Sequence, residues 1–144
     1  MPTAEERFSA ALHNTARAWR LEVDRRLKGL GVSQAGWMTI AVAARAKAPL
    51  AQIELAQRVG VEGATMVAML DRLARAGLIV REPAQDDRRI KRVVLTPAGL
   101  ALYDKVRVEA GAVRRRLLAG VDPRVLLAAT ELLEGIEAAL EDRA

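Results

Sequence analysis

The fold of this chain is decided by residues 50–99, LAQIELAQRVGVEGATMVAMLDRLARAGLIVREPAQDDRRIKRVVLTPAG. Apolar residues recur every three or four positions in its first half, which predicts two helices separated by a turn at Gly60. The inward face of the first helix is predicted to consist of Ile53, Leu55, Ala56 and Val59. The inward face of the second, over residues 62–76, is predicted to consist of Met66, Met69, Leu70 and Leu73. The two helices and their glycine turn therefore predict a helix-turn-helix.

Two β-rich runs follow the second helix and flank a polar segment. They are LIV at 78–80 and VVL at 93–95, and together they predict a β-hairpin. The tip and second strand of this hairpin carry four cationic side chains, Arg88, Arg89, Lys91 and Arg92. A charged loop is usually only a solvated surface, but a basic hairpin directly after a helix-turn-helix is better interpreted as a wing.

Composition limits the class of protein. The chain has 144 residues, of which 51% are hydrophobic and 3% aromatic, and this favours a single, mostly helical domain. Its net charge of +5 suits a polyanionic partner, although charge alone is equally compatible with a basic domain that binds no nucleic acid. The chain contains no cysteine and one histidine, and its carboxylates do not cluster at ligand spacing. We therefore predict no metal site and no cofactor.

Amphipathic helices are predicted on both sides of the central stretch. Apolar residues form one helical face from Phe8 to Leu30, and Ser33 is placed to cap a second helix that runs to about Arg45. Thr96-Pro97 and Asp122-Pro123 each combine an N-cap residue with proline at the first helical position.

These segments give a predicted organisation for the whole chain. We expect a single domain over residues 1–144, with a winged helix-turn-helix at 33–97 flanked by dimerisation helices at 1–32 and 98–144. The apolar stripes of the outer helices are longer than the small central module can cover. We therefore expect a homodimer, because such stripes left in water would form an exposed patch.

The predicted contacts with double-stranded DNA lie on the second helix of the helix-turn-helix and on the wing. The small, polar outer face of that helix suits insertion into a major groove, where alanine and threonine methyl groups contact thymine. Arginine suits a narrow minor groove, and Asp87 is placed to orient one arginine through a bidentate pair. The predicted DNA-contacting residues are Gly63, Ala64, Thr65, Ala68, Arg72, Arg75, Asp87, Arg88, Arg89 and Lys91.

Two sequence patterns resemble a known family. LAxxVGVxxxTMVxMLDRLxxxGLIxR…DDRRxKRVVLTPAG is similar to the MarR family of bacterial transcriptional regulators, and AWRxxxDRRLKxLGVSQAGW upstream is similar to its SlyA-like branch. The resemblance implies a mostly α fold with a small β-hairpin wing, an obligate homodimer, and binding to pseudo-palindromic operators. It also implies that helix 62–76 is the recognition helix and that either Arg88 or Arg89 enters the minor groove. SlyA-like relatives often carry a basic side chain where this chain has Ala68, which predicts more indirect reading of the operator.

The same resemblance implies control by a ligand. Family members commonly bind small aromatic acids in a cleft between the dimerisation helices and the winged helix, and this weakens DNA binding. The candidate ligand residues here are His13, Asn14, Arg17 and Trp37. Arg17 would pair with a carboxylate while Trp37 stacks on a ring. Alternatively, Trp37 is a core residue and His13 packs at the dimer seam.

Other classes of function have weaker support. No nucleophile–base pair or glycine-rich phosphate loop appears in the sequence, so no catalytic residue and no enzyme activity are predicted. A winged-helix adaptor that binds proteins without reading DNA is the alternative function. The N-terminal residues MPTAEERF are unlike a signal peptide, and no apolar run approaches the roughly 18 residues of a membrane span. We therefore expect a cytoplasmic protein that does not bind membranes.

Overall fold

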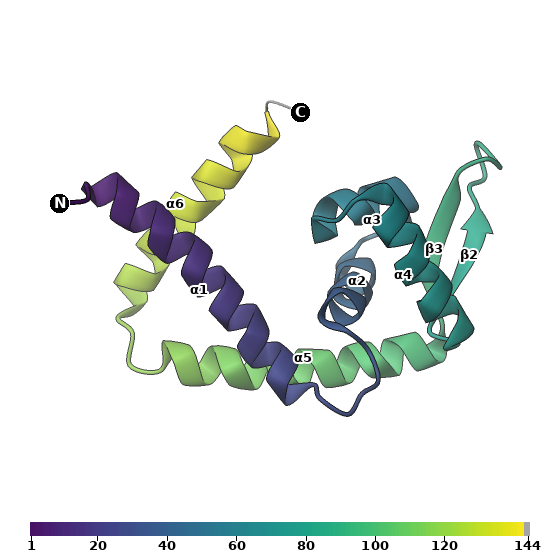
Figure 1. Ribbon diagram of the computed structural model, residues 1–144, viewed down its shortest axis with the longest axis horizontal. Coiled ribbons are helices and arrows are strands. Elements are labelled where there is room, and N and C mark those ends of the chain that lie inside the picture. Colours follow the sequence, from purple (N-terminus) through teal and green to yellow (C-terminus); the bar gives the residue numbers. More distant parts are fainter. Residues whose placement is uncertain (143–144) are drawn as a thin grey trace. The chain divides into compact units, whose positions relative to one another are not determined.

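A computed structural model describes residues 1–142, which form a mostly helical fold with a small antiparallel sheet (Figure 1). The elements are α1 (Ala4–Arg26), α2 (Gln34–Arg45), β1 (Leu50–Ala51), α3 (Gln52–Val59), α4 (Gly63–Arg75), β2 (Ile79–Pro83), β3 (Lys91–Leu95), α5 (Pro97–Leu118) and α6 (Pro123–Glu141). The predicted fold class is confirmed. The chain forms two compact units, residues 1–113 and the residues from 114 onward. The last two residues of the predicted segment 98–144 lie outside the described residues.

The sheet has three strands in the order β1-β3-β2. The predicted hairpin is confirmed as β2 and β3, with Val80 opposite Val94. The prediction of a hairpin alone was incomplete, because β1 pairs with the other edge of β3 and places Ala51 opposite Arg92. Two residues are too few to show a period-two pattern, so β1 leaves no signal in the sequence.

The helix-turn-helix packs against this sheet around one hydrophobic cluster. All four predicted inward residues of α4 are buried in it, together with Leu55 and Ala56 of α3. The prediction for Ile53 was wrong, because this residue lies in the first turn of α3 and is 69% exposed. A step of two residues turns an α-helix by about 200°, so Ile53 cannot share a face with Leu55.

A second cluster joins α1, α2 and α5 within residues 1–113. It contains Val23, Leu27, Trp37, Val106 and Val113. Helix α1 begins before the predicted apolar face, because Thr3 and Glu6 form a reciprocal capping box. It also ends earlier than predicted, at Arg26, and the glycines that follow, Gly29 and Gly31, have left-handed φ angles of 95° and 76°.

The remaining predicted helix starts are confirmed. The hydroxyl of Ser33 accepts a hydrogen bond from the backbone of α2, that of Thr96 accepts from Gly99 at the start of α5, and the Asp122 carboxylate accepts from Arg124 in α6. Along α6 every described residue is exposed except Ile136, which is half-buried. None of the helices within residues 1–142 is long and apolar enough to cross a lipid bilayer.

Candidate nucleic-acid interface

Helix α4 presents a small, polar face to solvent. Gly60 has a φ of 83°, which turns the chain between α3 and α4, and its N–H donates to the Ala56 carbonyl at 2.9 Å. The predicted contact residues of α4 are all exposed: Gly63, Ala64, Thr65, Ala68, Arg72 and Arg75. No atom lies within 4 Å of a Cβ built at Gly63, so this position is open for close approach by another molecule.

The wing is a short hairpin with an ordered tip. Beyond the last strand pair, the N–H of Ala84 donates to the Ile90 carbonyl at 2.8 Å, and the N–H of Ile90 donates to the Asp87 carbonyl at 3.0 Å. Ala84 is buried at the base of this loop. These contacts fix the backbone from which the arginines of the tip project.

Asp87 orients Arg89, and not Arg88. The Asp87 carboxylate accepts hydrogen bonds from Nε and Nη2 of Arg89, both at 3.1 Å, and from the Arg89 N–H at 3.0 Å. Together these bonds lower the pKa of Asp87. Arg88 makes no hydrogen bond or ion pair with residues 1–142. The Arg89 side chain is nevertheless 91% exposed, so it is held in one orientation while remaining accessible to a partner.

An ion pair that sequence reasoning missed connects the wing to α4. Nη2 of Arg81 on β2 donates to Asp71 Oδ1 at 2.6 Å and approaches the Val67 carbonyl at 3.5 Å. Nε of Arg81 is buried without a partner among the described residues. The guanidinium therefore depends on α4 for its hydrogen bonds, and it ties the first strand of the wing to the predicted recognition helix.

The end of α4 is also connected to the start of α5. The Thr96 hydroxyl donates to the Gly77 carbonyl at 2.6 Å, and the Thr96 N–H donates to the Leu78 carbonyl at 3.1 Å. A Cβ at Gly99 would overlap that Leu78 carbonyl oxygen, so only glycine allows α5 to begin this close. This contact fixes where α5 leaves the winged helix.

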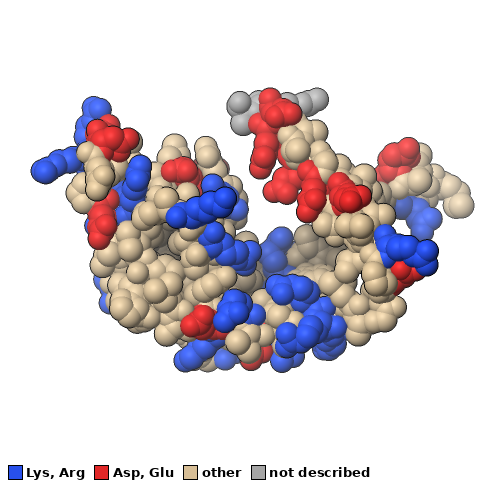
Figure 2. Space-filling view, turned by 180° about the vertical axis from the view of Figure 1, so that it is seen from behind, with Lys and Arg blue, Asp and Glu red and all other residues tan. Residues whose placement is uncertain are grey.

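Charge is unevenly distributed over the surface (Figure 2). Lysine and arginine side chains gather over the helix-turn-helix, the wing and α5, whereas acidic side chains gather along α6. Of these basic elements, the helix-turn-helix and the wing are predicted to contact a polyanion, whereas α5 belongs to a predicted dimerisation segment.

The predicted ligand residues do not come together in the described chain. His13, Asn14 and Arg17 are exposed on α1. Trp37 is only 7% exposed, and its Nε1 donates to Asp24 Oδ1 at 2.9 Å. Asp24 lies about 10 Å further along α1 than Arg17. Trp37 is thus a core residue in this chain, as the alternative interpretation held.

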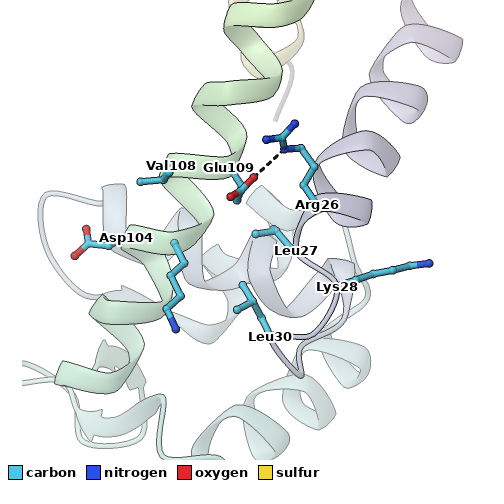
Figure 3. A pocket seen from close by; sticks show the side chains of 8 residues that line it. Arg26, Leu27, Lys28, Leu30, Asp104, Val108 and Glu109 are labelled. Atoms are coloured by element: carbon cyan, nitrogen blue, oxygen red, sulfur yellow. Dashed lines mark hydrogen bonds and ion pairs between the residues drawn. The ribbon is translucent and has the colours of Figure 1, made fainter.

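A pocket of about 350 Å³ lies elsewhere, between the end of α1 and the middle of α5 (Figure 3). Arg26 and Glu109 face each other across it and form an ion pair at 2.8 Å. Leu27, Leu30 and Val108 supply apolar walls. None of the predicted ligand residues lines this pocket, and no cluster of metal-binding side chains occurs within residues 1–142.

Comparison with known proteins identifies the family. A model of the MarR family matches residues 30–90. The solved transcriptional regulator PA3341 is 42% identical to this chain, and the match covers 94% of this chain and 98% of that one with a TM-score of 0.88. This chain belongs to the MarR family. It is therefore a DNA-binding transcriptional regulator and not an enzyme.

Two further solved structures are similar to this chain. A MarR family transcriptional regulator from Silicibacter pomeroyi is 29% identical, with 96% of each chain covered and a TM-score of 0.82. MepR of S. aureus, solved as a complex with DNA, is 19% identical, with 92% of this chain and 97% of that one covered and a TM-score of 0.77. The likeness to MepR concerns the fold.

Proposed function

We propose that this MarR protein is a homodimeric repressor that binds a pseudo-palindromic operator through α4 and the wing of each copy. The observation that carries this proposal is the exposed, small and polar face of α4 next to a wing whose Arg89 is pre-oriented by Asp87. The proposed contact residues remain Gly63, Ala64, Thr65, Ala68, Arg72, Arg75, Asp87, Arg88, Arg89 and Lys91.

In this proposal, α4 lies in the major groove with its first turns at the bases. Thr65 and Ala68 face outward one helical turn apart and offer methyl groups to thymine. Arg72 and Arg75 lie further along the helix, where they suit guanine or phosphate. Membership of the SlyA-like branch is also proposed on the two sequence motifs. Ala68 then lacks the basic side chain that would contact a base at this position. Recognition of the operator sequence therefore depends more on DNA shape.

We assign the minor-groove contact to Arg89. Its bidentate pair with Asp87 removes part of the entropy that a free arginine would lose on entering a groove. Arg88 and Lys91 then serve as phosphate contacts.

The homodimer is supported by the exposed apolar residues of α6. Val125, Leu127, Leu132, Leu133 and Leu140 are all exposed in the single chain. Burying each leucine would contribute roughly 1.5–3 kcal/mol, so a second copy is an effective cover. We retain the expected organisation, with a winged helix-turn-helix at 33–97 and dimerisation helices at 1–32 and 98–144. The dimer must then hold its two recognition helices about 34 Å apart to reach successive major grooves.

Relief of repression by a small aromatic carboxylate is part of the proposal. The pocket between α1 and α5 suits such a ligand, because its carboxylate would compete with Glu109 for Arg26 while the ring lies on Leu27, Leu30 and Val108. The exposed group His13, Asn14 and Arg17 remains the second location, provided that the partner copy closes over it. The two locations are distinguished by the effect of the ligand on operator binding in two variants. If the ligand no longer weakens binding of Arg26→Gln but still weakens binding of Arg17→Gln, the pocket is supported. The reverse pattern would support the second location.

Selection from a random DNA pool tests the function itself. Wild-type protein is expected to enrich a pseudo-palindrome, and Arg89→Ala is expected to weaken binding to it more than Arg88→Ala. Recovery of unrelated sequences with equal affinities would contradict the proposal and favour a protein–protein adaptor.

A further inference from the structure

A basic cleft lies on the winged-helix module outside the proposed contact surface. Its volume is about 540 Å³, and it is lined by the end of α2 and the loop after it, by β1, by α3 and by β3. Four of the lining side chains are cationic, namely Arg45, Lys47, Arg58 and Arg92, against a single carboxylate, Glu54. Apart from Arg92, which the sequence places on the wing, none of these residues was expected to form a site, because they come from separate segments of the chain.

The positive charge of this cleft is poorly compensated inside the protein. The side chains of Arg45, Lys47 and Arg58 make no hydrogen bond or ion pair with residues 1–142. Glu54 accepts a hydrogen bond from the N–H of Ala51 at 3.2 Å, so it caps α3 and neutralises only part of the charge. Arg92 reaches Asp86 of the wing at 3.8 Å. Cations that converge on one hollow repel each other, and an anion bound between them would remove that repulsion.

The cleft is continuous with the wing. Arg92 follows Lys91 on β3, and Ala51 of β1 pairs with Arg92 in the sheet. Arg58 lies on α3, which leads through the Gly60 turn into α4. The cleft is therefore built on the same strand as the wing and on the helix that precedes the recognition helix.

We infer that this cleft binds the sugar–phosphate backbone of the operator beside the wing, so that each copy contacts DNA at three places and not two. The inference rests on the proposed binding of DNA through α4 and the wing. Phosphates carry the negative charge that would neutralise the cations of the cleft. The continuity of the cleft with the wing favours DNA over a free anion. Backbone contacts carry no sequence information, so the cleft adds affinity and lengthens the footprint without changing which operator is preferred.

The test uses a variant that neutralises the cleft but leaves the wing intact: Arg45→Gln, Lys47→Gln and Arg58→Gln together. Affinity is measured against salt concentration on two duplexes that contain the same selected operator. One duplex ends at the wing contacts, and the other extends about one helical turn (roughly 10 base pairs) beyond them on each side. Wild-type protein is expected to bind the longer duplex more tightly and with a steeper salt dependence.

In the cleft variant, the advantage of the longer duplex should disappear. The slope of log K against log salt should become shallower by about 0.9 for each phosphate that the variant no longer neutralises. A matched control keeps the positive charge of the cleft, through Arg45→Lys, Lys47→Arg and Arg58→Lys together, and should keep both properties. Equal thermal melting of the two variants would show that the change is not a loss of fold.

Two results would overturn the inference. In the first, the cleft variant and the control show the same salt slope and the same preference for the longer duplex. In the second, inorganic tripolyphosphate raises the melting temperature of wild type but not of the cleft variant, while both bind DNA alike, which would assign the cleft to a free anion. A wild-type protein that prefers no sequence would contradict the proposed function, yet a salt slope that depends on the cleft would still support the backbone contact.

Discussion

The pair between Arg81 and Asp71 should set the position of the wing relative to the recognition helix. Nη2 of Arg81 lies 2.6 Å from Asp71 Oδ1, and the two side chains are 26% and 49% exposed. We consider Arg81→Met, which keeps an apolar stem, Asp71→Asn, which removes the charge, and the double variant. If the pair positions the wing, either single substitution should lower operator affinity, and the second should add little to the first.

The magnitude follows from the exposure of the pair. Fully exposed ion pairs contribute about 0.2–1 kcal/mol, whereas removing one partner of a buried pair costs about 3–5 kcal/mol. The two side chains are a quarter to a half exposed, so solvent screening makes the contribution of this pair much smaller than the value for a buried pair. We therefore expect a coupling energy of about 1 kcal/mol, equivalent to roughly a fivefold change in affinity for each half-site.

A double-mutant cycle on operator affinity measures this coupling. Fluorescence anisotropy with the selected operator gives the four affinities, and urea unfolding gives the stability of each variant. A scrambled duplex serves as the reference, and binding to it should change little, because backbone contacts tolerate a displaced wing. Strictly additive losses from Arg81→Met and Asp71→Asn would refute the proposed role of the pair.

Three further predictions concern the α5 junction, the dimer and the wing. Gly99→Ala should lower the free energy of unfolding by roughly 1–3 kcal/mol in urea titrations, because the new Cβ overlaps a backbone carbonyl oxygen. Gly135→Ala, in open space on α6, should raise the free energy of unfolding by up to about 1 kcal/mol. Equal effects of the two substitutions would contradict the close approach of α5 to Leu78. Leu133→Glu should shift the protein towards monomer in sedimentation experiments, and an unchanged dimer would exclude this part of α6 from the interface. Hydrogen bonds from Arg89 lower the pKa of Asp87, so the Asp87–Arg89 pair should be fully formed above the ordinary pKa range of aspartate and lost only as the pH falls through the lowered pKa. NMR of the Arg89 Nε–H should show this pH dependence. Loss of the pair at a higher pH would contradict the prediction.

Three of the predicted helix starts rest on local signals and are confirmed. Ser33, Thr96 and Asp122 cap helices through hydrogen bonds that reach only two or three residues along the chain, so their role follows from residue type and neighbours. The buried face of α4 follows in the same way from its helical spacing.

Contacts between residues that are distant in the sequence were not predicted. Strand β1 exists only because Leu50 pairs with Val93 across the fold, and Arg81 meets Asp71 only because β2 folds back along α4. Trp37 occupies an apolar helical position that suits a ligand platform as well as a core residue, and its burial and its hydrogen bond to Asp24 distinguish the two. Sequence spacing does not show which distant residues come into contact. It therefore predicts neither these contacts nor the basic cleft.

In the proposed function, α4 and the wing together recognise a specific operator. The most direct measurement compares the affinity of the wild-type protein for the selected pseudo-palindrome with its affinity for a scrambled duplex of the same length and composition, at one fixed salt concentration. We expect a preference of about a thousandfold or more for the palindrome, and a sharply smaller preference in Arg89→Ala. Equal affinities for the two duplexes, or a preference unchanged in Arg89→Ala, would contradict it.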